Sequence, residues 1–389
     1  MTRTTPVGSA GVTPKRVVIA GLGDAGVLTA IRLARRHDVV GVSVKPGLVS
    51  GQELGVRLAR PDDWARDYWI PFHRFHGLDR VRTVHGALTG ADLAARTITV
   101  TDAAGAERRE PFDALVIATG VTNGFWRRPV LQSPDDVELG LREAHDRLST
   151  ATSVIVLGGG AAAVSSAANL AARWPGKRVA LYFRGDEILP QHHRRTRRWI
   201  TKRLDELNVE LYPGHRAMVP EGFGCDAITA DAVHFSTGQP PACADAVLWA
   251  IGRVTPNTDW LPRDILDDDG FVRVTPQLQV PGVPGVFAVG DVAATDELRS
   301  SARNRADALA ANNVAAFFTG RRMRAYRPPG RRWGSVLGPQ LDGLDVFAPN
   351  GFRFHFPAWS IRRVLQPWIV RRGIYRGVRD EVPAGRYPG

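Results

Sequence analysis

Three glycines near the start of the chain could hold a phosphate group through the backbone alone. They stand in the run Gly21-Leu22-Gly23-Asp24-Ala25-Gly26. A glycine at the first position permits a tight turn, and one at the second lets the backbone approach a pyrophosphate. The third lets a helix pack closely on a strand. Because glycine turns also occur for purely structural reasons, the flanking elements decide the interpretation.

The flanking sequence predicts a strand, a helix and a second strand. Val17–Ala20 is a short apolar run with β-branched residues, typical of a buried parallel strand. Apolar residues recur at helical spacing from Val27 to Ala34, and another apolar run covers Val39–Val44. This order predicts a βαβ unit in which the N–H groups and the positive dipole end of the helix face an anion.

The same pattern returns later in the chain. Ser153–Leu157 predicts a buried strand, and the run Gly158-Gly159-Gly160-Ala161-Ala162-Ala163 predicts a second glycine turn. An alanine-rich helix follows to about Arg173, and Arg178–Phe183 predicts the next strand. The chain therefore carries two units of one kind.

Each unit is closed by an apolar strand that ends in a glycine. Phe112–Gly120 ends in Ala-Thr-Gly, and Ala246–Gly252 ends in Ala-Ile-Gly. We expect Thr119, Gly120 and Gly252 at these ends to contribute to the two sites. Two dinucleotide sites in one chain indicate electron transfer between two cofactors.

The composition fits a globular protein with more than one domain. The chain has 389 residues, of which 44% are hydrophobic and 23% charged. The two cysteines, Cys225 and Cys243, are expected to be unreactive buried thiols, so neither a disulfide framework nor a metal centre is predicted. Met1–Thr13 lacks the apolar core of a signal peptide, and no apolar run predicts a transmembrane helix. We therefore expect a cytoplasmic protein.

The formal net charge of +12 indicates an anionic partner. Nucleic acid is not expected, because no known nucleic-acid-binding motif is present. Anionic lipid and phosphate-bearing cofactors are better candidates, and solvated surface arginine is the alternative. Many of the arginines stand near the end of the chain, at Arg321, Arg322, Arg324, Arg327, Arg331, Arg332, Arg362, Arg363, Arg371 and Arg372.

A third signal comes late, where the apolar run Val283–Val289 leads into Gly290 and Asp291. With the two glycine turns and their closing strands, it resembles the pyridine-nucleotide-dependent flavoproteins of the disulfide-reductase-like superfamily. The resemblance covers roughly residues 15–320. It is greatest to the branch with type II NADH:quinone oxidoreductases and apoptosis-inducing-factor-like quinone reductases. It implies bound FAD, with Asp291 bonding a ribityl hydroxyl of the flavin.

The resemblance also implies the domain organisation. The fold class is α/β, with two Rossmann-like dinucleotide-binding domains, for FAD and NAD(P), the second inserted in the first. We expect the FAD domain at residues 14–125 and 253–325 and the NAD(P)H domain at 126–252. A basic C-terminal region at 326–389 would follow, lying on a membrane surface or docked on the FAD domain or a second subunit.

The implied activity is the transfer of hydride from NAD(P)H to the flavin and of electrons onward to an acceptor. A quinone is the favoured acceptor, because no cysteine stands between Pro46 and Phe75, where disulfide-reducing relatives carry a redox pair. A small electron-transfer protein such as a ferredoxin is the enzymatic alternative. The non-catalytic alternative is a sensor of NAD(P)H that changes its oligomeric state.

Two positions depart from the family pattern. The strand after the first glycine turn ends in Ser43, followed by Lys45, where relatives carry an acid that bonds the adenosine ribose. A serine can bond one hydroxyl, so weaker FAD binding is expected. Ser165 stands where many relatives have a glutamate near the nicotinamide, which predicts a less efficient hydride step.

The coenzyme is predicted to be NADPH. The second turn ends in Ala163, a variant common in NADP-binding units of this superfamily. The strand that follows ends in Phe183 and Arg184 instead of the acid that bonds the 2′-hydroxyl of NAD. Arg184 resembles the arginine that holds the 2′-phosphate in NADPH-dependent relatives, with Arg194 or Arg195 as a second candidate.

The end of the chain predicts an amphipathic helix. Its apolar residues are expected largely on one face, flanked by arginines, as at the interface of an anionic membrane. Pro367 is expected to kink or divide this helix. The apolar residues are Trp359, Ile361, Val364, Leu365, Trp368 and Ile369. We expect this helix to hold the protein at the inner face of the membrane or to dock on protein.

Overall fold

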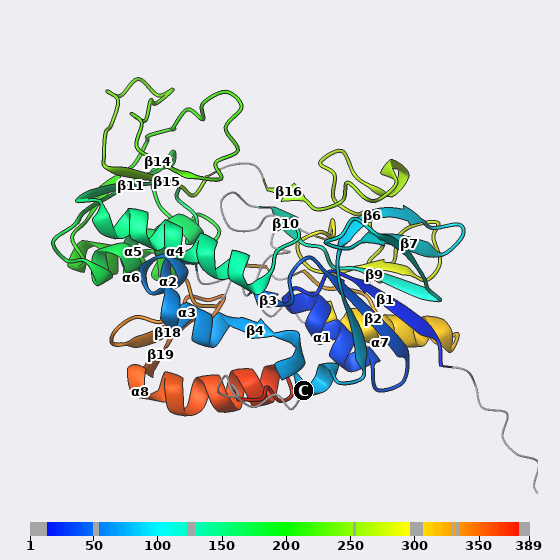
Figure 1. Ribbon diagram of the computed structural model, residues 1–389. Coiled ribbons are helices and arrows are strands. Elements are labelled where there is room, and N and C mark those ends of the chain that lie inside the picture. Colours follow the sequence, from blue (N-terminus) through cyan, green and yellow to red (C-terminus); the bar gives the residue numbers. More distant parts are fainter. Residues whose placement is uncertain are drawn as a thin grey trace, which may run out of the picture.

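The computed structural model describes residues 14–49, 54–122, 129–251, 254–295, 306–328, 330–331 and 334–380. Two sheets, each with a core of parallel strands, lie side by side, and the C-terminal helix runs beneath them (Figure 1). Expectations for Met1–Thr13, Gly252 and Arg332 concern positions outside these ranges.

The first sheet has the strand order β17-β9-β1-β2-β5, with all pairs parallel. Helices α1 and α7 pack on one face, and a three-stranded antiparallel sheet packs on the other. The elements are β1 (Arg16–Ala20), α1 (Asp24–Leu33), β2 (Asp38–Ser43), β5 (Val81–His85), β6 (Ala87–Asp92), β7 (Thr97–Thr101), β8 (Glu107–Pro111), β9 (Ala114–Ile117), β17 (Val286–Ala288) and α7 (Ala306–Phe318).

The second sheet has the order β13-β12-β11-β15-β14, parallel except for β14. Helices α4, α5 and α6 share one hydrophobic core with the β11, β12 and β15 residues of one sheet face. The elements are α4 (Pro134–Thr150), β11 (Ser153–Leu157), α5 (Ala161–Arg173), β12 (Arg178–Tyr182), α6 (Arg194–Glu206), β13 (Val209–Tyr212), β14 (Ile228–Thr229) and β15 (Ala246–Trp249).

The chain passes between the two sheets through a short antiparallel ribbon. β10 (Val121–Thr122) leads out of the first sheet and pairs with β16 (Thr255–Pro256), which leads back. Because β17 then completes the first sheet, the second Rossmann-like unit is inserted in the first. The α/β fold class with two such units is confirmed, whereas the boundaries at 125, 252 and 325 stay predictions.

A helix of the N-terminal part, α2 (Leu54–Ala59), packs on the second unit. It lies against α5 so closely that a Cβ on Gly55 would be 2.2 Å from the carbonyl oxygen of Ser165. The Ser165 hydroxyl is buried and donates to the Leu337 carbonyl at 3.2 Å. Asn169 donates to the same carbonyl at 2.8 Å. Ser165 therefore lies in a packed junction between helices and the C-terminal segment.

The remaining short elements connect these layers. They are β3 (Gly47–Val49), α3 (Pro61–Tyr68), β4 (Trp69–Pro71), η1 (Phe72–Arg74), η2 (His76–Leu78) and η4 (Arg263–Ile265). Cys225 is buried as expected, but Cys243 is exposed, so the expectation of two buried thiols was wrong for Cys243. Ala242 and Ala244, on either side of it, pack against the core beneath β15, so the alternate residue Cys243 faces outward.

The C-terminal region forms a hairpin and one long helix. β18 (Gly343–Phe347) pairs with β19 (Arg353–Pro357), and α8 (Ala358–Ser360) leads into the π-helix η5 (Ile361–Ile374). Helix η5 continues through Pro367, so the predicted division was wrong, and the predicted kink stays a prediction. Proline removes only one N–H group, and the wider i→i+5 winding is maintained around it.

The predicted single apolar face of this helix was also wrong. Ile361 and Leu365 are buried against Leu344, whereas other apolar residues of the segment are exposed. An α-helical spacing rule assigns faces incorrectly when the backbone is wound as a π-helix. The exposed members are Trp359, Val364, Trp368 and Ile369.

The chain after η5 returns to the first unit. Val378 forms an antiparallel bridge with Phe75, and the Arg379 guanidinium bonds Asp79. The Phe75 ring contacts Tyr375 edge to face at 5.3 Å. The C-terminal segment thus closes over the side of the first unit. Among the described residues, none of the helices combines the length and the hydrophobicity that a membrane-spanning segment requires.

Candidate functional site

The first glycine turn joins β1 to α1 and is tightly enclosed by backbone. Gly21 has φ +100°, and a Cβ there would be 2.5 Å from the Ala118 carbonyl oxygen. A Cβ on Gly26 would be 1.9 Å from the carbonyl oxygen of Gly21. Both positions therefore require glycine, one for backbone conformation and both for space.

Gly23, at the N-cap of α1, has open space around it, unlike Gly21 and Gly26. A Cβ there would meet no described atom within 4 Å, and no side chain caps the helix. The first N–H groups of α1 have no intrahelical partner and face this space, with the positive end of the helix dipole. The turn thus offers an uncapped helix N-terminus beside an open space.

Asp24, the first residue of α1, is tied to the end of the chain. The Tyr375 hydroxyl donates to its carboxylate at 2.7 Å. Burial, and then the Asp24 charge, raise the pKa of Tyr375 well above its usual value, so the phenol stays a donor. No local signal in the sequence predicts this contact, which joins residues 351 positions apart.

The end of β2 lies beside the same turn, because the Gly21 N–H bonds the Val42 carbonyl at 2.9 Å. Ser43 is the last residue of β2, and its hydroxyl oxygen accepts the Lys45 N–H at 3.2 Å. Burial, and then the Arg57 charge, lower the pKa of Lys45 to about 8. Two cationic side chains thus approach the strand end where relatives carry an acid.

Thr119 and Gly120 lie where the first unit opens into the crossing ribbon. The Thr119 hydroxyl donates to the Asn257 carbonyl at 2.8 Å, and the Asn257 amide donates back to the Thr119 carbonyl at 3.0 Å. The Asn257 backbone N–H bonds the Gly120 carbonyl at 3.1 Å. Asn257, which sequence reasoning missed, therefore fixes the exit and return of the chain at one point.

Gly290 and Asp291 follow β17 and lie at the start of α1. Gly290 has φ +82°, and a Cβ there would be 3.2 Å from the Cβ of Ala25. Asp291 is partly buried directly after it. The fold therefore brings the late aspartate next to the first glycine turn, although the two are far apart in sequence.

The second turn repeats this geometry between β11 and α5. Gly158 has φ +131°, and a Cβ there would be 2.6 Å from the Ala250 carbonyl oxygen. Gly160 is the N-cap of α5, with no side-chain cap and no described atom within 4 Å of a Cβ. Ala163 occupies the third position, where its Cβ is accommodated and buried.

The strand β12 ends next to this second turn. Phe183 follows it, is buried, and lies 3.3 Å from the Cβ position of Gly159. Arg184 comes next and is exposed. Of the two further arginines expected nearby, Arg194 lines a cavity at the start of α6, and Arg195 is an exposed neighbour of Gly351.

Comparison with known proteins agrees with this geometry. The family model for pyridine nucleotide-disulphide oxidoreductases matches residues 15–313, so the chain belongs to that family. "Oxidoreductase ptaL" of Pestalotiopsis fici is 25% identical over 380 residues, covering 92% of this chain and 96% of the relative. The chain is thus an oxidoreductase of the FAD-dependent, NAD(P)H-using class.

Two solved structures share the fold. The sulfide:quinone oxidoreductase of Aquifex aeolicus has a TM-score of 0.65 at 14% identity, covering 93% of this chain and 92% of that chain. NDH2 from Plasmodium falciparum in complex with NADH has a TM-score of 0.55 at 14% identity, covering 72% and 64%. Type II NADH dehydrogenases are therefore among the structural neighbours, as the resemblance implied.

The residues of the first turn fit the FAD that this family binds. A pyrophosphate needs a backbone cradle without side chains, and the open space at Gly23 beside the uncapped α1 supplies one. Asp291 follows the end of β17 beside this cradle, and Lys45 follows the end of β2. The matching space at Gly160 fits the pyrophosphate of the nicotinamide coenzyme.

Proposed function

We propose that the chain passes electrons from NADPH, through FAD, to a quinone. The observation that carries this proposal is the pair of matched glycine turns, each with an uncapped helix and an open space at its N-cap. The chain leaves the first unit through β10 and comes back from the second unit through β16. The pairing of these two strands and the hydrogen bonds of Asn257 hold both segments together. Such a pair suits two dinucleotides that exchange a hydride.

Bound FAD supplies the redox chemistry, accepting a hydride from the nicotinamide and releasing two electrons to the acceptor. The residues of this chain bind and orient. Gly23 and Gly160 would leave room for the two pyrophosphates. Asp291 would accept a hydrogen bond from the flavin's ribityl chain, and the Ser43 hydroxyl would donate to the adenosine ribose. No protein acid or base is required for the hydride step itself.

The preference for NADPH rests on the end of β12. Phe183 and Arg184 replace the acid that would bond the 2′-hydroxyl of NAD and repel a 2′-phosphate. The exposed Arg184 guanidinium is free to reach a phosphate, to which it can make a charge-assisted, bidentate contact. One structural neighbour binds NADH, and this proposal distinguishes our chain from it.

The quinone acceptor is supported by the chemistry of one structural neighbour, a sulfide:quinone oxidoreductase. It is also supported by the sequence, because neither cysteine lies in residues 46–75, where disulfide-reducing relatives carry a redox pair. Steady-state oxidation of NADPH by the purified protein, with a soluble quinone, with a ferredoxin and with neither, tests the proposal. We expect turnover with the quinone. Turnover only with ferredoxin would make the chain a ferredoxin-type reductase, and none with either would favour a sensor.

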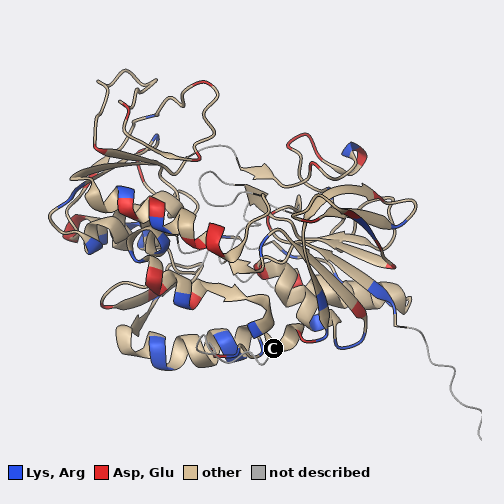
Figure 2. Ribbon diagram, in the orientation of Figure 1, with Lys and Arg blue, Asp and Glu red and all other residues tan. Residues whose placement is uncertain are grey.

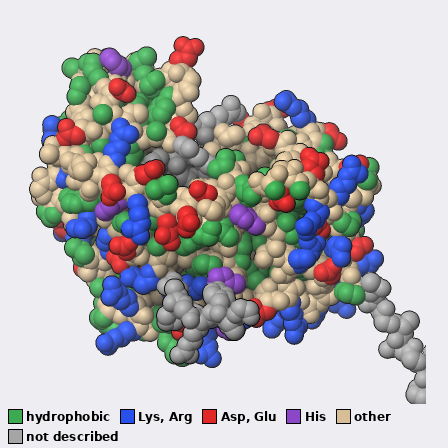
Figure 3. All heavy atoms as spheres, viewed as in Figure 1, with side chains coloured by type: hydrophobic (Ala, Val, Ile, Leu, Met, Phe, Trp, Pro, Cys, Tyr) green, Lys and Arg blue, Asp and Glu red, His purple; other side chains and the backbone are tan. Residues whose placement is uncertain are grey.

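We further propose that the C-terminal helix meets an anionic membrane surface. Trp359 and Trp368 are 63% and 58% exposed, and Arg362 and Arg372 lie on the same helix. Figure 2 marks the Lys and Arg positions along this helix, and Figure 3 shows basic side chains along the same edge of the molecule. Aromatic and arginine side chains together suit the interface of an anionic bilayer.

Liposome co-sedimentation tests the membrane proposal. Trp359→Ser with Trp368→Ser should lower binding to anionic vesicles, while Phe352→Ser, an exposed aromatic of the hairpin, serves as a control. Point variants are preferable to truncation, because the segment after η5 holds Tyr375 on Asp24. Equal partitioning of the double variant and the unaltered protein would favour docking on a second subunit.

A further inference from the structure

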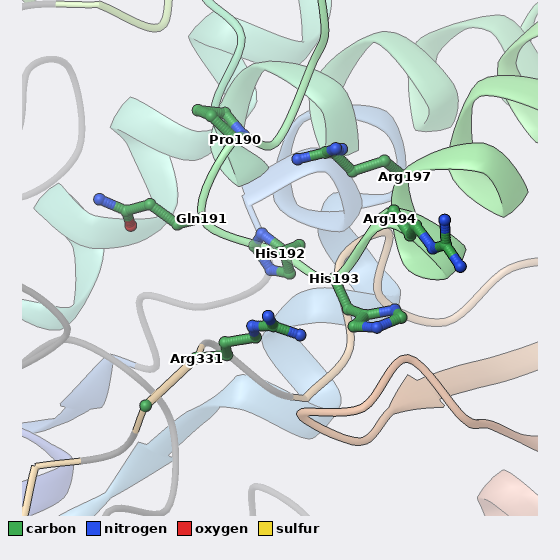
Figure 4. Close-up of a pocket in the computed structure, with 8 residues that line it drawn as sticks. Pro190, Gln191, His192, His193, Arg194, Arg197 and Arg331 are labelled. Carbon is green, nitrogen blue, oxygen red and sulfur yellow. The ribbon is translucent and has the colours of Figure 1, made fainter.

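A cavity of about 540 Å³ opens at the start of α6, between the second unit and the C-terminal region. The side chains of His192, His193 and Arg331 lie around it, and Arg331 reaches toward the two histidines from the C-terminal segment (Figure 4). The lining residues are Pro190, Gln191, His192, His193, Arg194, Arg197, Gly330 and Arg331.

The cavity is strongly basic. Three of its eight lining residues are arginines and none is acidic. Arg197 pairs with Glu187 outside the lining, at 2.9 Å through its Nη2 atom. Its buried Nε has no hydrogen-bond partner among the described residues. The local excess of positive charge is therefore uncompensated by the cavity walls.

The positive charge of the cavity also acts on His193. Its Nδ1 accepts the Arg195 N–H at 3.2 Å and so caps α6. Partial burial, and then the charges of Arg331, Arg195, Arg194 and Arg197, lower the pKa of His193. These cations come from both elements at the cavity, α6 and the C-terminal segment, and the Gly351 loop adds only backbone against the imidazole. An anion in the cavity would reverse this effect.

The size of the cavity limits the class of ligand. A volume of about 540 Å³ lies in the range of pockets that hold small organic molecules and exceeds what an inorganic ion fills. Phosphate groups are commonly bound by bidentate hydrogen bonds from arginine guanidinium groups and by the N–H groups at a helix N-terminus. We propose that this cavity binds the phosphate group of a small organic ligand, held between the start of α6 and the C-terminal segment.

The phosphate has two candidate sources. One is the 2′-phosphate of the coenzyme, since the loop lining the cavity begins where the Leu189 N–H bonds the Gly159 carbonyl of the second turn at 2.7 Å. In that case the site rests on the proposed preference for NADPH. The other source is a separate organic phosphate, which would bind whichever nicotinamide coenzyme is used.

The test uses the full-length holoprotein, with sulfate and 2′,5′-ADP as probes, in calorimetric titrations at constant ionic strength. Arg331→Gln should weaken both probes about tenfold, the loss typical of one charged hydrogen-bond partner. Arg198→Gln, on the exposed side of α6 outside the cavity, should leave both unchanged. Absence of binding to the unaltered protein, or an equal effect of the two variants, would overturn the proposal.

A second measurement separates this site from a general attraction of arginines for anions. Sulfate keeps its double charge between about pH 5.5 and 8, whereas histidine gains a proton over this range. Sulfate binding should therefore tighten as the pH falls, because the bound anion raises the pKa of His193. His193→Asn keeps an N-cap acceptor and should weaken this dependence. An unchanged pH dependence in His193→Asn contradicts the proposed site.

Competition identifies the source of the phosphate. Sulfate displaced by NADPH and not by NADH assigns the cavity to the coenzyme's 2′-phosphate, and sulfate retained with either coenzyme assigns it to a separate ligand. Both results support the site. The rate of flavin reduction by NADPH and by NADH, measured without sulfate, tests the coenzyme preference independently, so the two proposals can fail separately.

Discussion

The two glycine turns have one architecture and very different tolerances. In the first, a Cβ at the third position would be 1.9 Å from a carbonyl oxygen, while in the second that position is Ala163 and its side chain is accommodated. The first turn is also held by Tyr375 from the end of the chain. A shared motif can therefore determine the path of the backbone without determining how tightly the surrounding residues pack against it.

The strand ends beside the two turns differ in the same sense. Lys45, at the end of β2, is partly buried and has a lowered pKa, whereas Arg184, at the end of β12, is exposed. A cofactor that stays bound suits the enclosed site, and a coenzyme that enters and leaves in each cycle suits the open one. Substitutions at matched positions of the two units test whether this contrast in packing and exposure is real.

The largest expected effect is that of Gly26→Ala. The added Cβ meets backbone that has no room to move, so we expect loss of several kcal/mol of stability and of bound flavin. Ala163→Gly in the second turn should cost about 1 kcal/mol or less. Flavin content of the purified variants and their thermal unfolding measure the difference. Similar behaviour of the two variants would contradict the contrast in packing.

Asp291→Ala should come next, with flavin bound roughly tenfold or more weakly. A hydrogen bond to a charged group contributes about 1.5–3 kcal/mol, and 1.4 kcal/mol is a factor of ten. Fluorescence titration of the apoprotein with FAD gives the dissociation constant. Asp268→Ala, an exposed acid of a nearby turn, is the control. An unchanged constant for Asp291→Ala would remove this residue from the flavin site.

Tyr375→Phe tests the brace on the first turn. Without the phenol, the Asp24 carboxylate loses a buried donor, and we expect the unfolding free energy to fall by about 2 kcal/mol. Tyr212→Phe removes a similar bond, to Glu210, from a half-exposed pair in the second unit, and should cost less than 1 kcal/mol. Urea unfolding of both variants decides, and equal losses would show that Tyr375 gives no special support.

The smallest effect concerns Lys45 in the apoprotein. Its folded-state pKa of about 8 lies below its ordinary value of 10.5, so the charged form costs stability below pH 8 and the cost disappears as the pH rises toward 10.5. Lys45→Met should raise the unfolding free energy at pH 7 by roughly 1 kcal/mol, after screening. The gain should shrink at pH 9. A gain in unfolding free energy that does not change with pH would show that it comes from packing of the methionine and not from removal of the charge.

Local patterns predicted the elements around both turns. β1, α1 and β2 form where apolar periodicity and glycine punctuation indicate them, and α5 ends at Arg173 as expected. These features depend on residues close in sequence. The assignment of Asp291 to the flavin came from family resemblance. Its nearness to the first turn is a contact between distant segments, which no local signal predicts.

What the sequence did not predict depends on tertiary contact. Asn257 gives no motif, and its role follows from the pairing of β10 with β16. The cavity at α6 needs Arg331, which approaches His193 only through the return of the C-terminal segment. The winding of η5 as a π-helix changed which residues share a face, and a spacing rule cannot anticipate that.

The most direct test of the proposed electron path is rapid mixing of the oxidised protein with NADPH or NADH, without oxygen and at equal subsaturating concentrations. The visible absorbance of the flavin reports the hydride step. We predict that NADPH reduces the flavin of the unaltered protein faster than NADH does. In Arg184→Ala, the rate of reduction by NADPH should fall about tenfold, and the rate of reduction by NADH should change little. Faster reduction of the unaltered protein by NADH would contradict the account.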